Sequence, residues 1–336
     1  MGVSIREVAA RAGVSVGTVS NVLNRPGSVP QATLERVRAA IADLGYVRND
    51  AARQLRAGRS TTVGLVVLDA RNPFFTDVAR GADDAAARHG LSVLIGNSDE
   101  QPERELRLVS HFEEQRALGL LISPIGDDVA RLREIHDRGT PVVLVDRTVE
   151  GSGFSSVAVD DIHGGELAAR HLLETGRRRL AYIGGPVSLR QVEDRAEGAR
   201  RAVAAVAGAT LETVPVASLT VAEGRAAGER IAAMPAAERP DAVFAANDLI
   251  ALGVLQALVQ AGVSVPDDVA LIGYDDIDFA SAAAVPLSSI RQPSHRMGET
   301  ALSILVEEAA DPSLEPRVVV FEPELVVRAS TAPNAR

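Results

Sequence analysis

The chain has 336 residues, which is too long for one typical domain and predicts two or three. It contains no cysteine, which excludes disulfides and thiolate metal sites. It has no N-terminal apolar leader and no run of about 18 apolar residues, so we expect a cytoplasmic protein without a membrane-spanning helix.

The formal net charge of −10 conceals a difference between the start of the chain and the rest. Residues 1–60 hold nine arginines against four acidic residues, whereas the remainder holds 26 basic and 41 acidic side chains. A basic module joined to an acidic body is typical of a protein whose small module approaches phosphates.

The first two predicted helices form a pair joined by a glycine turn. Ser4 and Glu7 fit a capping box that begins a helix, and Gly13 suits its left-handed stop. Ser15 is a second N-cap, and apolar residues recur at helical spacing after it. Two such helices form a helix-turn-helix unit, whose second helix fits the DNA major groove. The alternative is an ordinary helical hairpin inside a larger domain.

A third helix is predicted over residues 31–44, with Gly45 as its stop, which completes a small helical bundle. Residues 49–56 form a further short, helix-prone segment that ends before Gly58. A helix this short is marginal alone, so we expect it to fold when DNA or a partner chain supplies contacts.

From Thr62 onward, strand-like and helix-like segments alternate. Candidate strands rich in Val, Leu and Ile lie at 63–69, 91–97, 118–123, 142–146, 157–160, 180–183, 213–216, 242–246 and 269–273. The helices between them lie near 76–89, 102–116, 128–138, 163–175, 195–207, 222–234 and 249–261. This alternation predicts an α/β body of two doubly wound parallel-sheet subdomains, with ligands at the carboxyl ends of the strands. A last helix near 295–309 and strands near Val318 and Leu325 are expected to cross back between the subdomains.

Short motifs in a fixed order run along nearly the whole chain. They are Gly13-Val14-Ser15, Thr18-Val19-Ser20 and Asn24; Leu44-Gly45-Tyr46; Ala52 and Leu55; Asn72-Pro73-Phe74-Phe75; Pro141 and Asp146-Arg147; Gly184-Gly185-Pro186 and Arg195; Ala246-Asn247-Asp248 and Gly253; and Pro266 to Asp268 with Ile272-Gly273-Tyr274-Asp275. In this order and spacing the chain resembles the lactose-repressor (LacI/GalR) family of transcription regulators.

The resemblance implies a helix-turn-helix headpiece in residues 1–47 and a hinge helix with linker in residues 48–60. Residues 61–336 would form a ligand-binding and dimerisation domain like the periplasmic (type I) sugar-binding proteins. Its N-subdomain is expected at about 61–160 and 291–320, and its C-subdomain at about 161–290 and 321–330. Such a regulator is usually a repressor that works as a homodimer on pseudo-palindromic operator DNA, without a cofactor.

The resemblance places part of the second helix at the DNA bases. Val16, Gly17 and Asn21 take the base-reading positions, where Asn21 can pair with adenine and Val16 can meet a thymine methyl. A second set of polar residues is placed for phosphates: Ser15, Thr18, Ser20 and Asn24. The alternative for Thr18 and Ser20 is plain helix surface. Gly17 stands where the family usually has a polar residue, and close packing or tolerance explains it as well as recognition does.

The resemblance also assigns the hinge. Leu55 would wedge between two base pairs in the minor groove. Unstacking these base pairs costs a few kcal/mol, which the wider contacts of protein with bent DNA offset. Arg53 and Arg56 would lie near phosphates, and the alternative is that Leu55 packs on the body. Arg48 stands where the family often has Pro, so hinge ordering is expected to depend more on DNA.

By the resemblance, an effector binds in the cleft between the subdomains. The first set of residues is Phe74, Asp146, Arg195, Asn247 and Asp275, and their neighbours are Phe75, Arg147, Arg190, Gln191 and Asp248. Carboxylates and an amide can form hydrogen bonds with the hydroxyls of a sugar. The guanidinium of Arg195 can donate to two neighbouring hydroxyls, and a phenyl ring can cover an apolar face of the sugar.

Each of these residues has an alternative role. Asp275 would cap a helix, Phe74 would be core, and Arg195 would pair with Glu193 or Asp194. Asn247-Asp248 favours a sugar over a purine as the effector. The alternative effector is a purine or a phosphorylated metabolite that acts as co-repressor.

Two other function classes compete with a regulator. A sugar receptor without a DNA role needs export, which the basic N-terminus and the missing leader oppose. An enzyme is opposed by the lack of a P-loop, of a nucleophile elbow and of histidines at metal-ligand spacing. We therefore expect no catalytic residue and no metal. Residues 331–336 carry no leucine heptads, which favours a dimer over a coiled-coil tetramer.

Overall fold

The computed structural model describes residues 3–46, 60–186 and 188–332. The chain separates into two compact units, residues 1–59 and residues 60–336. The segment predicted as a hinge helix, with Arg48, Arg53, Leu55 and Arg56, lies outside the described residues. No helix within the described ranges is long and apolar enough to cross a membrane.

The described part of the first unit is a bundle of short helices. They are α1 (Ile5–Ala12), α2 (Val16–Asn24), the 3-10 turn η1 (Pro26–Ser28) and α3 (Gln31–Leu44). Val8, Val19 and Val37 are fully buried where the three α-helices meet, so one apolar residue from each forms the centre of the core.

Side-chain caps fix the ends of these helices as the sequence predicts. The Ser4 backbone N–H donates to Glu7 Oε2 at 2.7 Å, and the Glu7 N–H donates back to Ser4 Oγ at 3.3 Å, which confirms the capping box. Gly13 ends α1 with a φ of 63°, and Gly45 ends α3 with a φ of 62°. Ser15 caps α2 through the Thr18 N–H at 3.0 Å.

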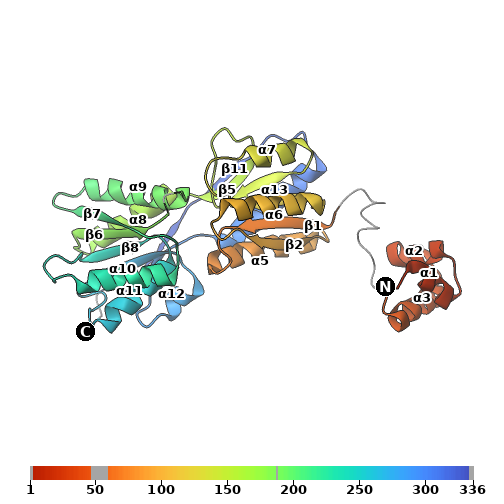
Figure 1. The fold of residues 1–336 in the computed structure, drawn as a ribbon, viewed down its shortest axis with the longest axis horizontal. Coiled ribbons are helices and arrows are strands. Elements are labelled where there is room, and N and C mark those ends of the chain that lie inside the picture. The colour runs from red at the N-terminus through yellow and green to blue at the C-terminus, as the bar shows by residue number, and fades with distance from the viewer. Residues whose placement is uncertain (1–2, 47–59, 187, 333–336) are drawn as a thin grey trace. The chain divides into compact units, whose positions relative to one another are not determined.

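The second unit contains two sheets that form the two lobes in Figure 1. Sheet A is parallel throughout, in the order β11-β5-β4-β3-β1-β2. Its strands are β1 (Thr62–Val67), β2 (Ser92–Asn97), β3 (Gly119–Ile122), β4 (Val142–Val145), β5 (Ser155–Val159) and β11 (Val318–Phe321). The inner strands are buried almost throughout, as parallel strands covered on both faces must be.

Sheet B has the order β12-β10-β9-β8-β6-β7, in which only β12 runs antiparallel to its neighbour among the described strands. Its strands are β6 (Arg179–Gly184), β7 (Thr210–Pro215), β8 (Ala242–Ala245), β9 (Ala270–Asp275), β10 (Ser288–Arg291) and β12 (Glu324–Val326). The chain therefore passes from sheet A to sheet B after β5, returns after β10, and passes again after β11. This arrangement confirms two parallel-sheet subdomains joined by crossing segments.

Helices cover both sheets and pack in pairs (Figure 1). On sheet A they are α5 (Pro73–Arg88), α6 (Pro102–Glu114), α7 (Ala130–Asp137) and α13 (Ser294–Ala310). On sheet B they are α8 (Asp161–Glu174), α9 (Arg190–Ala204), α10 (Val221–Ala233), α11 (Asp248–Gln260) and the short α12 (Asp278–Ala282). The closest pairs are α5 with α13, α8 with α9, and α10 with α11.

The α8–α9 crossing depends on two glycines. A Cβ at Gly165 would lie 2.1 Å from the Arg195 carbonyl oxygen, and a Cβ at Gly198 would lie 1.9 Å from the Ile162 carbonyl oxygen. The two backbones are therefore in direct contact, which fixes the part of α9 that carries Arg195.

The strands and helices predicted within the described residues are present, with differences in their bounds and two additional elements. Helix α5 begins at Pro73 and α9 at Arg190, each earlier than predicted. Strand β10 and helix α12 were not predicted. Pro73 at the first turn and the Asn72 side chain, which accepts the Phe74 N–H at 3.1 Å, explain the early start of α5.

Candidate functional site

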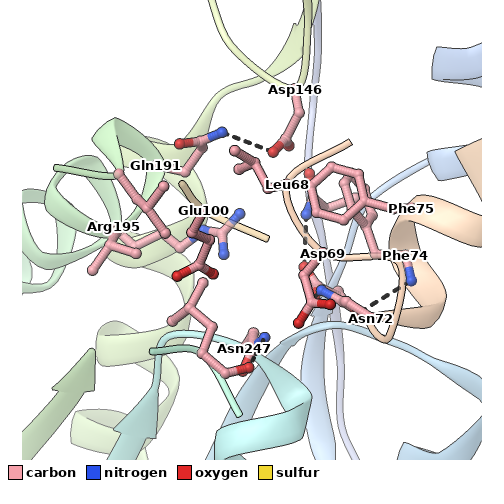
Figure 2. Close-up of a pocket in the computed structure, with 15 residues that line it drawn as sticks. Leu68, Asp69, Asn72, Phe74, Phe75, Glu100, Asp146, Gln191, Arg195 and Asn247 are labelled. Carbon is pink, nitrogen blue, oxygen red and sulfur yellow. Dashed lines mark hydrogen bonds between the residues drawn. The ribbon is translucent and has the colours of Figure 1, made fainter. Parts of the chain in front are cut away.

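A cavity of about 30 Å³ lies where the carboxyl ends of the two sheets meet. It is lined by residues from β-strand ends and from the helices that follow them, in both lobes: Leu68, Asp69, Asn72, Phe74, Phe75, Glu100, Asp146, Leu189, Gln191, Val192, Arg195, Leu219, Asn247, Asp275 and Gln292. Figure 2 shows Phe74 and Phe75 on one side of it, Gln191 and Arg195 on the other.

The structure brings the first predicted set together. Phe74, Asp146, Arg195, Asn247 and Asp275 all line this cavity. Phe75 and Gln191 from the second set line it too.

Three residues of the second set lie elsewhere. Arg147 and Arg190 line a larger, open groove of about 600 Å³ beside the cavity. The buried Arg147 donates to the Gly126 carbonyl oxygen at 3.0 Å and pairs with Asp127, so the loop after β3 draws it away. Asp248 is fully buried and accepts from the Ile277 N–H at 2.9 Å, so it supports a loop and does not face the cavity.

Arg195 makes more contacts with other protein groups than the sequence suggests. Its Nε donates to Asp161 Oδ1 at 2.8 Å, and its Nη1 donates to the Ala246 carbonyl oxygen at 2.8 Å. Its guanidinium lies 3.7 Å from the centre of the Tyr274 ring. The partner is thus Asp161 and neither Glu193 nor Asp194, and Nη2 remains to face the cavity because it has no hydrogen bond with the described residues.

Asp275 joins the two lobes and does not cap a helix. Its Oδ2 accepts from Asn72 Nδ2 at 2.8 Å, and its Oδ1 accepts from Gln292 Nε2 at 2.8 Å. Asn72 precedes α5 in one lobe and Asp275 ends β9 in the other, so this bond crosses the cleft.

A second bond crosses the cleft between Asp146 and Gln191. Gln191 Nε2 donates to Asp146 Oδ2 at 2.8 Å (Figure 2). Asp146 follows β4 with a φ of 68°, a left-handed conformation that Asp tolerates better than most residues. That turn directs its carboxyl toward the other lobe.

Three buried acceptor oxygens face this region without a donor. They are Asp146 Oδ1, Gln191 Oε1 and Gln292 Oε1, and no described residue donates a hydrogen bond to them. An unpaired buried oxygen costs free energy, so a bound molecule that brings hydrogen-bond donors is favoured.

Burial also shifts the ionisation of the carboxyls. It raises the pKa of Asp146 to about 8, helped by the Asp161 carboxylate and opposed by Arg195. It raises the pKa of Asp275 against the effect of Arg195, and with the Asp69 carboxylate it raises the pKa of Glu100 to about 7. Groups that accept hydrogen bonds from a ligand would therefore lose protons when the ligand binds near neutral pH.

Asn247 has a structural role as well as a place in the wall. Its Oδ1 accepts the Ile250 N–H at 2.9 Å as the N-cap of α11, and its Nδ2 donates to the Leu219 carbonyl oxygen at 3.3 Å. Both polar atoms of the Asn247 amide therefore already bond to the protein. This weakens the argument that Asn247 indicates a sugar effector and not a purine.

Sequence reasoning missed other residues of the wall, among them Asp69, Asn72, Glu100 and Gln292. Each lies within five residues of the end of a strand, which is where the α/β rule places ligands, although Glu100 follows the exposed edge strand β2. Gln292 was missed because β10 was not predicted.

The recognition helix α2 presents a small, partly apolar surface. Val16, Gly17 and Asn21 are exposed, and a Cβ at Gly17 would meet only Ser15 Oγ at 3.6 Å. Close packing therefore does not require this glycine. Thr18 and Ser20 are half-buried, Ser15 Oγ bonds to Thr18 Oγ1 at 2.9 Å, and Asn24 Nδ2 donates to the Ser20 carbonyl oxygen at 2.8 Å.

Comparison with known proteins agrees with this arrangement. A model of the lacI family of bacterial regulatory proteins matches residues 4–49, and a model of a periplasmic binding protein-like domain matches residues 169–331. The ribose operon repressor of Bacillus subtilis is 37% identical over 304 residues, which are 90% of each chain. The repressor PurR of Vibrio parahaemolyticus is 34% identical over 334 residues, which are 97% of each chain.

The same agreement holds in three dimensions. The crystal structure of the Lac repressor dimer bound to operator and the anti-inducer ONPF superposes with a TM-score of 0.84 at 26% identity. The match covers 98% of this chain and 99% of that one. The chain therefore belongs to the lacI family of bacterial regulatory proteins, and it is a DNA-binding transcription regulator and not an enzyme.

Proposed function

We propose that this chain is a repressor whose affinity for operator DNA is controlled by a sugar, ribose or a closely related pentose, bound in the cavity of Figure 2. The observation that carries the proposal is the set of buried side-chain oxygens, on Asp146, Gln191 and Gln292, that have no hydrogen-bond partner among the described residues. The two amide oxygens are acceptors at every pH, and the Asp146 oxygen is an acceptor once its carboxyl is ionised. Sugar hydroxyls supply such donors, and the phenyl rings of Phe74 and Phe75 suit an apolar sugar face. The similarity to a ribose operon repressor supports a pentose in particular.

The size of the cavity supports a conformational role for this ligand. A volume of about 30 Å³ holds one or two water molecules, so a sugar enters only if the lobes move apart. Hydroxyls of the sugar would then take the places that Asn72 and Gln191 hold against Asp275 and Asp146. Because the sugar binds one arrangement of the lobes better than another, it shifts the population between them. We propose that the sugar-bound arrangement releases DNA.

Thermal shift of the purified protein tests the ligand. The panel contains D-ribose, other pentoses, hexoses, sugar phosphates and purine bases. A ligand at about 100 times its Kd stabilises the folded protein by roughly 2.7 kcal/mol, which raises Tm by several degrees. A rise with a pentose supports the proposal. A rise only with a purine or a phosphorylated sugar, or with nothing in the panel, contradicts it.

A pair of variants tests the cavity. Asp275→Asn replaces a cavity acceptor, and Asp278→Asn changes an exposed residue nearby on α12. We expect the first to weaken ribose binding by about tenfold or more, since a bond to a charged group contributes roughly 1.5–3 kcal/mol, and the second to leave Kd within about twofold. Equal effects would remove Asp275 from the binding site.

For DNA, we propose the assignments of the sequence-based resemblance. Val16, Gly17 and Asn21 read bases, and Ser15, Thr18, Ser20 and Asn24 hold phosphates. Leu55 wedges into the minor groove, and Arg53 and Arg56 lie near phosphates. The exposure of Val16 and Asn21 on α2 supports the first part. Asn21→Ala should cost about 1–3 kcal/mol on the selected operator but little on random DNA. An equal loss on both would make Asn21 a phosphate contact.

We also propose a homodimer on a pseudo-palindromic operator. Leu94 and Ile95 are 52% and 53% exposed on the edge strand β2, and Leu106 on the adjoining α6 is 48% exposed. An apolar edge of this kind is usually covered by a partner. Sedimentation should show a dimer for the wild type and for Leu314→Asp, and a monomer for Ile95→Asp. A dimeric Ile95→Asp protein would place the interface elsewhere.

A further inference from the structure

Glu100 occupies an unusual loop between β2 and α6. Both Asp99 and Glu100 have a φ of 55°, in the left-handed region that non-glycine residues seldom adopt. The Glu100 N–H donates to the Leu68 carbonyl oxygen at 3.1 Å, and the Gln101 N–H donates to the Ser98 carbonyl oxygen at 3.1 Å. This strained loop is thereby fixed against the end of β1, and it points the Glu100 carboxyl into the cavity (Figure 2).

The Glu100 carboxyl has no structural partner in the described part of the chain. It forms no hydrogen bond or ion pair with any residue in the described ranges. Arg71, the cation that interacts with it at longer range, bonds to Asp69 at 2.9 Å and to Asp99 at 3.1 Å. The raised pKa of Glu100, about 7, agrees with a half-buried carboxyl that lacks a counter-charge. A side chain in this position has no evident role in folding.

The wall as a whole is acidic. Asp69, Glu100, Asp146 and Asp275 all line the cavity, against the single guanidinium of Arg195 in the described wall. That guanidinium is already neutralised by Asp161 at 2.8 Å. Proteins that bind phosphate groups usually present several arginine or lysine donors, whereas the described wall offers a phosphate only Nη2 of Arg195.

Helix N-termini are the other common anion sites. At the starts of α5 and α11, a cap side chain already accepts one first-turn N–H: Asn72 accepts the Phe74 N–H at 3.1 Å, and Asn247 accepts the Ile250 N–H at 2.9 Å. Helix α9, whose Leu189, Gln191 and Val192 line the cavity, has no side-chain cap, so rejection of a phosphate must come from the acidic side chains of the wall.

We infer that Glu100 is a specificity-determining residue, which restricts the effector to an uncharged sugar and rejects the phosphate ester of the same sugar. The inference rests on the proposed function. A carboxylate accepts hydrogen bonds from two hydroxyls of a neutral sugar, whereas a phosphate of charge about −2 brings no donors and is repelled. One residue can thus separate two molecules that share the same carbon skeleton.

The test compares D-ribose with D-ribose 5-phosphate by calorimetric titration at about pH 8, where the carboxyl is mostly ionised. The proteins are the wild type, Glu100→Gln, Glu100→Asp and Glu103→Gln. Glu103 is exposed on the first turn of α6, so its variant makes the same change of net charge outside the cavity.

We expect the wild type to prefer ribose by about 100-fold or more, and Glu100→Gln to lose about tenfold or more of that preference through tighter binding of the phosphate. Glu100→Asp and Glu103→Gln should keep it. An unchanged preference in Glu100→Gln while ribose still binds overturns this inference and leaves the proposed function intact. Failure of the wild type to bind either molecule overturns the pentose proposal itself, and with it this inference.

Discussion

The buried carboxyl of Asp146 provides a test of the cavity that needs no ligand. Its pKa is about 8 in the folded protein, against an ordinary value of 3.8. The folded state therefore holds a proton that the unfolded state releases between these pH values, so stability must fall as pH rises through this window. The loss of folding stability from ionising Asp146 is complete only above about pH 8.

Linkage gives the size of the effect. One proton bound only by the folded state changes the free energy of unfolding by about 1.4 kcal/mol per pH unit, or about 4 kcal/mol between pH 5 and pH 8. Asp146 shares its titration with Asp161 and Asp275, so we expect about half of this, roughly 2 kcal/mol. Asn is neutral at every pH, can still accept from Gln191, and tolerates the φ of 68°.

The assay is the melting temperature of ligand-free protein across that pH range. Asp146→Asn should melt within about 2 °C of the wild type near pH 5 but roughly 4–8 °C higher near pH 8. Asp83→Asn, an exposed position on α5, should follow the wild type at every pH. Parallel pH profiles for Asp146→Asn and the wild type would refute the reasoning, because they would show that this carboxyl is not held protonated by burial.

Other substitutions separate packing, stability and DNA binding. Gly198→Ala should lower stability by more than about 2 kcal/mol, because its Cβ would lie 1.9 Å from a backbone oxygen of α8; denaturant titration checks it. Gly17→Ala should stabilise the headpiece by up to about 1 kcal/mol and alter operator preference, which melting and DNA titration measure together. Leu55→Ala should weaken operator binding by about tenfold or more while ligand Kd stays within about twofold, as paired titrations would show. Arg195→Leu should cost about 3–5 kcal/mol by leaving a buried charge unpaired, and adding Asp161→Leu should recover much of that loss in the same unfolding assay.

The fold was predictable because its signals are local. Capping residues such as Ser4 and Ser15, the stop at Gly13, and runs of Val, Leu and Ile each act within one element. Strand β10 was not predicted because three of its four residues, Ser288, Ser289 and Arg291, are polar. Its place between β9 and β12 stabilises it as a strand.

The candidate site was predictable in outline for a different reason. Asp146 and Asp275 each lie at the end of a buried strand, where α/β proteins bind ligands. Their strands belong to different sheets, so the family resemblance was needed to place both residues in one cleft. Side-chain direction could not be placed in this way. Arg147 points into the groove, Asp248 supports a loop, and Glu100 enters the cavity only because of two left-handed residues.

The central claim is that a sugar in the cavity controls binding of DNA by the headpiece. The most direct measurement is the Kd for an operator selected from random DNA by the protein itself, determined by anisotropy with and without saturating D-ribose. A typical coupling of about 1–3 kcal/mol predicts that ribose raises this Kd by about 5- to 150-fold, and that Asp275→Asn removes the effect. Binding of ribose with no change in the operator Kd would contradict the account.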